Sequence, residues 1–238
     1  MDQFSLPDRF GPYPEGSQPQ VPIEGYRNTV ARSPSHAPFR RPLTRTELTG
    51  PLDLTQKLQP GDNNLASLEP GRMAVGQLIH VSGQVLDEDG RPVRGAVVEL
   101  WQANSAGRYY NSLDTRDAPL DPNFIGNGRT RTDGDGRYAF FTVKPGAYPV
   151  PDSGRWWRPS HIHFSVLGPS SLSRLVTQMY FPGEWLNAHD RLIHSIADPA
   201  AQARLVCHPV PTAEVEGDWL AFTHSLVVRG RHATPSLP

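Results

Sequence analysis

Cysteine is almost absent from the sequence. Cys207 is the only one among 238 residues, so the chain can form neither an internal disulfide nor a thiolate cluster around a metal. A lone cysteine can act as a nucleophile when its thiol pKa is lowered, but Cys207 follows Val206 in a short apolar run, which favours a small buried residue. Any metal would therefore be bound by nitrogen and oxygen atoms.

Long apolar runs and a surplus of one charge are absent as well. No stretch of about eighteen apolar residues occurs, so we expect no segment that spans a membrane. The formal net charge is -1 at pH 7, which does not favour a nucleic-acid or membrane-surface partner. Residues 1–7 contain neither the basic nor the apolar region of a signal peptide. We therefore predict a cytoplasmic protein.

Three widespread catalytic motifs are missing too. The sequence contains no glycine-rich phosphate loop, no H-E-x-x-H zinc motif and no G-x-S-x-G nucleophile motif. Residues 133–136 have the D-G-D-G sequence that can begin a calcium loop, but the later oxygen ligands of an EF-hand are missing. This segment is more typical of a hairpin turn.

Proline and glycine are abundant, with 25 and 21 residues. Together with short β-favouring stretches, this composition is typical of short strands joined by ordered loops. We predict a long loop over residues 102–129 and strands over residues 77–86, 96–101, 137–143, 177–181 and 220–228, and around 161–164. A helix over residues 200–206 is expected after Asp198, a capping residue followed by proline. The predicted fold is all-β, an antiparallel β-sandwich core with long loops, whose first two strands form a hairpin.

The N-terminal part of the sequence differs from the rest. Residues 1–70 are rich in proline and polar residues and lack a sustained apolar period, so they cannot form a core alone. A structureless segment of this length is unusual beside a compact domain. We therefore predict an extended proline-rich arm over residues 1–70, packed at a subunit interface, and a β-sandwich catalytic domain over residues 71–238.

Two histidines, His161 and His163, lie two residues apart in a β-favouring run. Side chains alternate between the faces of a strand, so both histidines point to the same side. Such a pair can bind a metal through two ring nitrogens, or it can simply be a half-exposed strand face. Oxygen ligands would come from loops that contain Tyr109 and Tyr148, although a loop tyrosine is usually a packed aromatic. A carboxylate ligand would favour Fe(II) or Mn, and a tyrosinate would favour Fe(III).

Several stretches together resemble the intradiol ring-cleaving dioxygenases. These stretches are ELWQAN at 99–104, GRY at 107–109, APLDPNF at 118–124, KPGAYP at 144–149 and WRPSHIHF at 157–164. The likeness extends from residues 31–34 to residues 226–230 and therefore covers nearly the whole chain. It is strongest to the β chains of the branch of this family that acts on protocatechuate.

The resemblance implies one non-haem Fe(III) ion per chain. Its protein ligands would be Tyr109, Tyr148, His161 and His163, with a solvent hydroxide as the fifth ligand. Tyr148 and His163 would be axial, and Tyr109 and His161 equatorial. The resemblance also implies that Tyr148 is catalytic, because the displaced tyrosinate takes a proton from the substrate. A trivalent cation lowers the pKa of a tyrosine far enough for the phenolate to form at neutral pH.

The resemblance gives roles to residues beside the metal as well. Arg158 and Gln178 would be catalytic residues next to the substrate, and Trp101 would line the substrate pocket. Tyr26 and Arg32, in the arm, match positions that help to bind the ring carboxylate. A guanidinium keeps its charge at any working pH, which suits Arg158 for stabilising a carbanion-like ring, although it could also form a purely structural ion pair.

The activity implied by the resemblance is intradiol cleavage of protocatechuate by O2 to 3-carboxy-cis,cis-muconate. This reaction belongs to the β-ketoadipate pathway of aromatic compound catabolism. The implied partners are the catechol substrate, O2 and a homologous α subunit in a hetero-oligomer, with no nucleic acid and no membrane. Val150 stands where relatives often carry tryptophan, so the substrate preference is open.

Three alternatives to this activity remain at this point. A catechol or hydroxyquinol 1,2-dioxygenase would share the iron ligands, but such relatives usually carry a helical N-terminal domain, and the proline-rich arm does not look helical. An extradiol enzyme would need Fe(II) bound by two histidines and a carboxylate. A β-sandwich without a metal could bind a ligand or assemble without catalysing a reaction.

Overall fold

The computed structural model of the protein describes residues 13–20, 23, 26, 58–151, 153–168 and 174–237. The strands are β1 (Ser67–Glu69), β2 (Arg72–Met73), β3 (Leu78–Leu86), β4 (Val97–Trp101), β5 (Asn127–Arg131), β6 (Arg137–Val143), β7 (Tyr148–Pro149), β8 (Trp157–Arg158), β9 (His161–Leu167), β10 (Arg174–Tyr180), β11 (His208–Pro209), β12 (Leu220–Thr223) and β13 (Leu226–Val227). The helices are η2 (Trp185–His189), α3 (Arg191–His194), α4 (Pro199–Ala203) and η3 (Thr212–Glu214).

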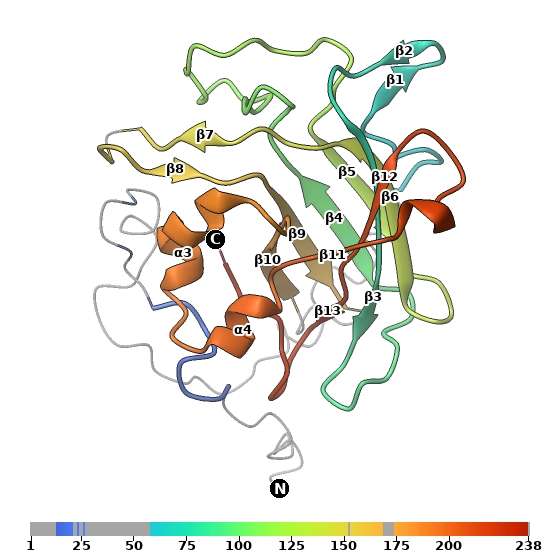
Figure 1. The fold of residues 1–238 in the computed structure, drawn as a ribbon. Coiled ribbons are helices and arrows are strands. Elements are labelled where there is room, and N and C mark those ends of the chain that lie inside the picture. The colour runs from blue at the N-terminus through green and yellow to red at the C-terminus, as the bar shows by residue number, and fades with distance from the viewer. Residues whose placement is uncertain are drawn as a thin grey trace, which may run out of the picture.

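Two sheets form the body of the fold. The first has the strand order β10-β9-β4-β5, and the second has the order β11-β12-β3-β13, with β6 also paired to β3. The described pairs within these sheets are antiparallel, except that β12 and β13 run parallel to β3. Figure 1 shows the first sheet between the second sheet on one side and α3 and α4 on the other. The predicted all-β sandwich is therefore confirmed, with two parallel pairings added.

Strand β9 divides its side chains between two environments. Ile162 and Phe164 are part of the main core, where the rings of Phe164 and Phe140 lie 6.4 Å apart. Burial of each such side chain contributes about 1.5–3 kcal/mol. His161 and His163 lie on the opposite face of the strand, where His161 stacks on a tyrosine of the second apolar cluster. The predicted division of this strand into a histidine face and an apolar face is confirmed.

Helices α3 and α4 cover the outer face of the first sheet. Their buried residues form the second apolar cluster, which also includes Trp156 and Tyr180. Asp198 caps α4 as predicted, with Pro199 as the first helical residue. The helix is shorter than predicted because the residues after it pair with the end of β10. The amide of Tyr180 donates to the carbonyl of Leu205 at 2.8 Å, which closes that end of the cluster.

The predicted hairpin of the first two strands is wrong. Strand β3 lies beside β6 in the second sheet, and β4 lies between β9 and β5 in the first sheet. The turn after β3 returns the chain only as far as Val93, whose amide donates to the carbonyl of Val85 at 2.8 Å. Gly95, with a φ of 74°, then directs the chain into the other sheet. Both strands supply apolar side chains to the same core, so their sequence patterns look alike.

The turn over residues 133–136 is confirmed, but it is not a hairpin turn. It joins β5 and β6, which lie in different sheets. The carboxylate of Asp133 accepts the amides of Asp135 and Arg137 at 2.9 and 2.8 Å, which occupies it in the turn itself. Two further differences concern strands. Strand β5 begins within the predicted loop 102–129, and the predicted strand 220–228 is divided into β12 and β13.

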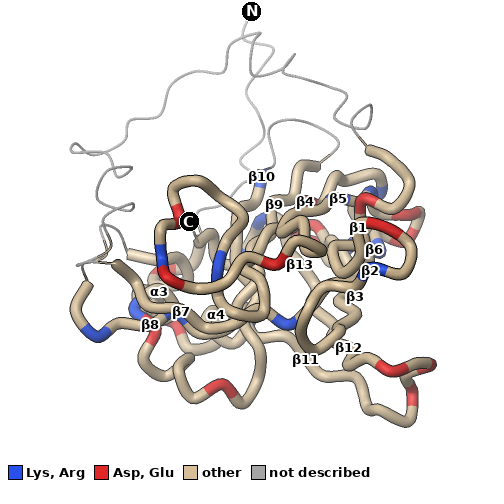
Figure 2. Tube along the Cα trace, turned by 90° about the horizontal axis from the view of Figure 1, so that it is seen from above, with Lys and Arg blue, Asp and Glu red and all other residues tan. Residues whose placement is uncertain are grey.

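The structure also bears on the predictions made from cysteine, charge and apolar segments. Cys207 is buried, as predicted, and burial raises the pKa of its thiol to about 12. Figure 2 shows both signs of charge spread over the described elements. In the part of the chain that the structure describes, no helix is long and apolar enough to cross a membrane.

Part of the predicted N-terminal arm is described, namely residues 13–20, 23, 26 and 58–70. Near the start of the chain, the amide of Gln20 donates to the carbonyl of Ser195 at 2.8 Å, beside α3. Farther along, Asn64 forms a bridge with Phe141, and β1 pairs with β2. The division into an arm over residues 1–70 and a domain over residues 71–238, and the position of the arm at a subunit interface, stay predictions.

Candidate metal centre and active site

Tyr109 and Tyr148 belong to two chain segments that touch through their backbones. A Cβ atom on Gly146 would lie 2.4 Å from the carbonyl oxygen of Ser105, and one on Gly107 would lie 2.4 Å from a carbonyl oxygen of the facing segment. Gly107 also has a φ of 79°, which other residues rarely adopt. Glycine at these two positions permits the approach, which brings the two tyrosine rings to 5.6 Å, edge to face.

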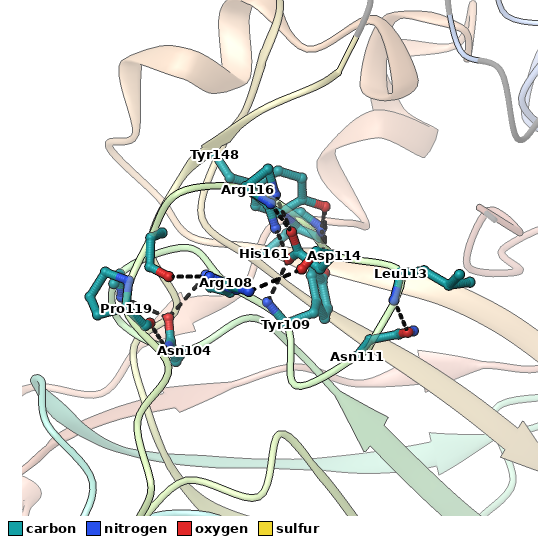
Figure 3. Close-up of polar contacts among 12 residues, drawn as sticks. Asn104, Arg108, Tyr109, Asn111, Leu113, Asp114, Arg116, Pro119, Tyr148 and His161 are labelled. Carbon is teal, nitrogen blue, oxygen red and sulfur yellow. Dashed lines mark hydrogen bonds and ion pairs between the residues drawn. The ribbon is translucent and has the colours of Figure 1, made fainter.

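Polar side chains fold the long loop around Tyr109 (Figure 3). The side-chain oxygen of Asn104 accepts the amide of Arg108 at 3.0 Å, and the guanidinium of Arg108 donates to two carbonyls of the loop at 2.7 and 3.2 Å. Asp114 accepts the amide of Tyr109 at 2.9 Å. Burial alone would raise the pKa of Asp114, but hydrogen bonds from Arg116 and from backbone amides lower it. The loop is therefore held in one conformation without regular secondary structure.

Polar atoms of Tyr109, Tyr148, His161 and His163 converge. The hydroxyl of Tyr109 lies 3.0 Å from Nε2 of His163, 3.5 Å from Nε2 of His161 and 3.5 Å from the hydroxyl of Tyr148. The hydroxyl of Tyr148 lies 3.3 Å from Nε2 of His161. The two predicted tyrosines and the two predicted histidines therefore meet at one place, between β9 and the two loops.

Burial determines the protonation of these side chains. It lowers the pKa of His161 well below the usual value and that of His163 to about 3, so both rings are neutral at pH 7. It raises the pKa of Tyr109 and of Tyr148, so both hydroxyls keep their protons in the absence of a cation. A metal ion reverses the preference of the tyrosines because it stabilises the phenolate.

The donor atoms suit a hard trivalent metal ion. The Nδ1–H of His161 donates to the carbonyl of Pro159 at 2.6 Å, which leaves Nε2 as the ring nitrogen that could bind a metal. Among the residues that the structure describes, no group of three or more His, Cys, Asp and Glu side chains could hold a metal. Two imidazole nitrogens with two phenol oxygens fit Fe(III), because anionic oxygen ligands favour that ion.

Trp101 lies flat against His163. The two rings are parallel to within 8°, with centroids 4.8 Å apart, and the residues face each other across β4 and β9. Within the described residues, Nδ1 of His163 is buried and has no hydrogen-bond partner. Stacking on Trp101 therefore helps to orient the ring of His163. The ring of His161 is oriented instead by its hydrogen bond to the carbonyl of Pro159.

Arg158 is buried close to the histidines, with 1% of its surface exposed. Its Nε lies 3.0 Å from Oδ2 of Asp190, and its Nη2 donates to the hydroxyl of Tyr180 at 3.0 Å and to the amide oxygen of Gln178. The ring of Tyr180 in turn stacks on that of His161 at 5.9 Å. Nη1 of Arg158 is buried without a partner among the described residues, so this donor is available to a ligand.

Three residues of the site were not predicted from the sequence. Tyr180 follows Gln178 by two positions in β10, so the period of a strand could have found it. Asp190 caps α3, and no local pattern links it to Arg158, 32 positions earlier. Arg116 lies in the long loop, where it packs on Tyr148, and the sequence carried no signal for it.

Among the remaining predicted residues, Tyr26 lies close enough to the converging hydroxyls that, besides burial, its electrostatic influence raises the pKa of Tyr109 and of Tyr148. Tyr26 packs edge to face on Trp156, with ring centroids 5.5 Å apart, against the second apolar cluster. Val150 packs against the same cluster, and its amide donates to the carbonyl of Trp156 at 3.0 Å. Arg32 lies outside the described residues. Roles for Tyr26 and Arg32 in substrate binding therefore stay predictions.

Comparison with known proteins gives consistent matches. A family model described as "Dioxygenase" matches residues 48–230. A protocatechuate 3,4-dioxygenase beta chain from Burkholderia cepacia is 44% identical over 92% of this chain and 93% of its own length. A hydroxyquinol 1,2-dioxygenase from Rhizobium sp. (strain MTP-10005) is 35% identical over 46% of this chain and 39% of its own length. The solved dioxygenase domain of a carbohydrate-binding fusion protein from Streptomyces sp. SirexAA-E is 27% identical, with a TM-score of 0.50, over 70% of this chain and 86% of that one.

The coverage of these matches and the side chains of the site point to the same family. The range that the family model matches contains every described strand, and the Burkholderia relative is similar over nearly the full length of both proteins. Enzymes of this family use non-haem iron, the kind of metal that the tyrosine and histidine donors suit. The chain therefore belongs to the dioxygenase family that this model describes, the intradiol ring-cleaving dioxygenases.

Proposed function

We propose that this chain is the iron-bearing subunit of a protocatechuate 3,4-dioxygenase. It cleaves protocatechuate (3,4-dihydroxybenzoate) with O2, between the two hydroxyl-bearing carbons, to 3-carboxy-cis,cis-muconate in the β-ketoadipate pathway. The observation that carries the proposal is the convergence of two tyrosine hydroxyls and two histidine nitrogens at 3.0–3.5 Å. The choice of substrate rests on similarity to the Burkholderia cepacia beta chain over 92% of this chain.

Tyr109, Tyr148, His161 and His163 would hold one Fe(III) ion. Bound iron(III) supplies Lewis acidity, which draws electron density from a chelated catechol and makes its ring reactive toward O2. Two phenolates and a hydroxide balance three positive charges, so the site can remain neutral in buried surroundings. Burial also keeps both histidines in the neutral form that binds a metal.

Tyr148 would also accept a proton. A catechol arrives with two hydroxyl protons, and both must leave before its two oxygens can bind a metal. The phenolate oxygen of Tyr148 would be a base inside the site and would take one of these protons, and a solvent hydroxide would take the other. This oxygen lies 3.3 Å from Nε2 of His161, so the proposed base belongs to the cluster of residues that would hold the metal.

Arg158 would stabilise negative charge on the ring of the substrate. Its unpartnered Nη1 is the donor that can face a ligand, while Asp190 and Tyr180 fix the other guanidinium nitrogens. A fixed cation in buried surroundings stabilises developing charge without having to reorganise during the reaction. Gln178, which contacts Nη2, would help to hold the guanidinium in that orientation.

A homologous α subunit is the proposed partner, in a hetero-oligomer. The similar Burkholderia cepacia protein is named as a beta chain, which implies an alpha chain for that enzyme. Large apolar side chains of the loop around Tyr109 are also exposed, among them Tyr110 at 71% and Leu113 at 86%, as is typical of protein contact surfaces. A cytoplasmic location remains a prediction.

The alternatives are less well supported. The hydroxyquinol relative from Rhizobium matches over only 46% of this chain, so a catechol or hydroxyquinol 1,2-dioxygenase accounts for less of the sequence. An extradiol enzyme would need a carboxylate beside the two histidines, and the described residues contain no such group of three. A β-sandwich without a metal would give no reason for the convergence of these donors.

The proposal is tested by visible absorption spectroscopy of the purified protein with iron analysis, before and after adding protocatechuate without O2. We expect a broad tyrosinate-to-iron(III) charge-transfer band that shifts when the substrate binds. Tyr148→Phe should weaken the band. Tyr138→Phe is the matched control, since the hydroxyl of this buried tyrosine donates to the carbonyl of His224 in the core. A colourless wild-type protein at full iron occupancy would contradict the proposal.

The substrate is tested separately by steady-state oxygen uptake with protocatechuate, catechol and hydroxyquinol. The proposal expects the highest kcat/KM for protocatechuate and 3-carboxy-cis,cis-muconate as the product. A higher value for catechol or hydroxyquinol would leave the iron site intact but overturn the choice of substrate.

A further inference from the structure

The long loop that carries Tyr109 also places a cation on Tyr148. Cζ of Arg116 lies 4.2 Å from the centroid of the Tyr148 ring, and Figure 3 shows its side chain directed to that ring. The Arg116 side chain is 16% exposed, so most of it is packed into the site. Arg116 is therefore a packed part of the site and not a side chain that moves freely on the surface.

Asp114 holds Arg116 in this place. One carboxylate oxygen accepts Nε of Arg116 at 2.8 Å and its amide at 3.2 Å, and the other oxygen pairs with Nη2. The second oxygen also accepts the amide of Tyr109 at 2.9 Å. The Asp114 side chain is only 8% exposed. A planar guanidinium can bind both carboxylate oxygens, which an ammonium group cannot do in the same geometry.

This arrangement connects both tyrosines through one ion pair. Asp114 fixes the backbone of Tyr109, and Arg116 covers one face of the Tyr148 ring. The rings of Tyr109 and His161 lie against Tyr148 at 5.6 and 5.5 Å, so three neighbours together limit how its ring can turn. A cation over an aromatic face is attracted by its electron density, and the attraction increases when the ring becomes a phenolate.

We propose that Arg116, held by Asp114, is a positioning residue that orients the Tyr148 ring and stabilises its anionic form when a metal is bound. This inference rests on the proposed function, because the anionic form arises only with a metal ligated by Tyr148. Arg116 would not bind the metal itself. It would act through Tyr148, by stabilising the negative charge on that ligand.

The test uses the iron-loaded protein and three variants. Arg116→Met removes the charge and keeps a long side chain, Arg116→Gln removes the charge and keeps hydrogen bonding to Asp114, and Arg116→Lys keeps the charge. Arg91→Met is the matched control, because Arg91 forms an exposed ion pair with Asp89 at 2.6 Å. The measurements are the charge-transfer band and the rate at which a chelator removes iron.

We expect the band of the Met and Gln variants to move to longer wavelength, since loss of the cation raises the energy of the donor orbitals of the phenolate. Iron should leave on the order of tenfold faster, as expected for loss of a buried cation–π contact. The Lys variant keeps the charge but loses the paired hydrogen bonds to Asp114, so its band should lie between those of the wild type and the Met variant. Arg91→Met should match the wild type in both measurements.

The outcomes separate this inference from the proposed function. If the wild type has no tyrosinate band, the proposed function fails. If the wild type has the band and the Met and Gln variants retain its position and the rate of iron loss, only the role of Arg116 fails. A Met or Gln variant could also be less stable while its folded molecules keep the band at the wild-type wavelength. That result would mean that Arg116 only stabilises the fold, and it would overturn the inference.

Discussion

Arg158 carries a positive charge into the interior of the protein, and Asp190 is the carboxylate that balances it. The two side chains are 1% and 0% exposed, and their atoms lie 3.0 Å apart. The other oxygen of Asp190 accepts the amide of Leu192 at 2.7 Å. One carboxylate therefore both caps α3 and orients the guanidinium beside the candidate metal centre, so the helix and the site depend on the same residue.

Replacing Asp190 should show both effects. For Asp190→Asn we expect the free energy of unfolding to fall by about 3–5 kcal/mol, because Arg158 is left as an uncompensated buried charge. We also expect kcat for protocatechuate to fall more than KM rises, since the guanidinium loses its orientation. Urea unfolding and steady-state kinetics measure these changes. Asp89→Asn, in the exposed pair with Arg91, is the control, and its free energy of unfolding should fall by only about 0–1 kcal/mol. An equal fall in the two variants would contradict a special role for the buried pair.

The residues of the site were predictable where a motif carried them. Tyr109, Tyr148, His161 and His163 lie in long ordered motifs, and the structure brings their polar atoms together. Tertiary contacts are a different matter, as Arg116 illustrates. Its position over a tyrosine 32 residues later depends on how a loop without regular secondary structure folds, and a single sequence contains no periodic signal for that fold.

At the scale of elements, the meeting of two loops through glycines has a direct test. In Gly146→Ala, the added methyl group would lie 2.4 Å from the carbonyl oxygen of Ser105, so the two segments must move apart. We expect weaker iron binding and a smaller charge-transfer band, because Tyr109 and Tyr148 lose their relative positions. Gly134→Ala is the control, since a Cβ at Gly134 has no atom within 4 Å. Equal iron content in the two variants would contradict the close approach.

Element positions were easier to predict than element pairings. Strand β6 has the predicted bounds, and β3 differs by one residue, because their apolar patterns are regular and turn residues flank them. The pairing of β3 with β4 was wrong because two strands that face one core from opposite sheets have the same pattern as a hairpin. Strand β5 (NGRTR) was missed because its composition is polar, and its pairing with β4 determines its structure.

At the scale of the whole molecule, a buried histidine should make stability depend on pH. His224 lies in the core between β12 and β13, and burial lowers its pKa from 6.5 to about 3. Below pH 6.5 the unfolded chain binds a proton that the folded protein does not bind until about pH 3. Stability is therefore lost as the pH falls through this window, by up to about 1.4 kcal/mol for each pH unit.

His224→Leu should remove this contribution. We expect the free energy of unfolding of the variant to differ from the wild type by a constant amount above pH 6.5. Below that pH the difference should change steadily in favour of the variant, down to about pH 3. Urea unfolding at a series of pH values measures it. Parallel curves for the two proteins across the whole range would contradict a neutral buried His224.

The two parallel pairings of β3 determine when the second sheet can be completed. Leu220 and Leu226 pair with Ile79 and Val85, so the partners of β3 lie about 140 residues later in the chain. A ribosome adds about 5–20 residues each second, so part of β3 waits on the order of ten seconds for the strands that cover it. During that time the unpaired backbone N–H and C=O groups of β3 can form hydrogen bonds with another chain, which favours aggregation. Correct assembly therefore depends on protecting an incomplete sheet during synthesis.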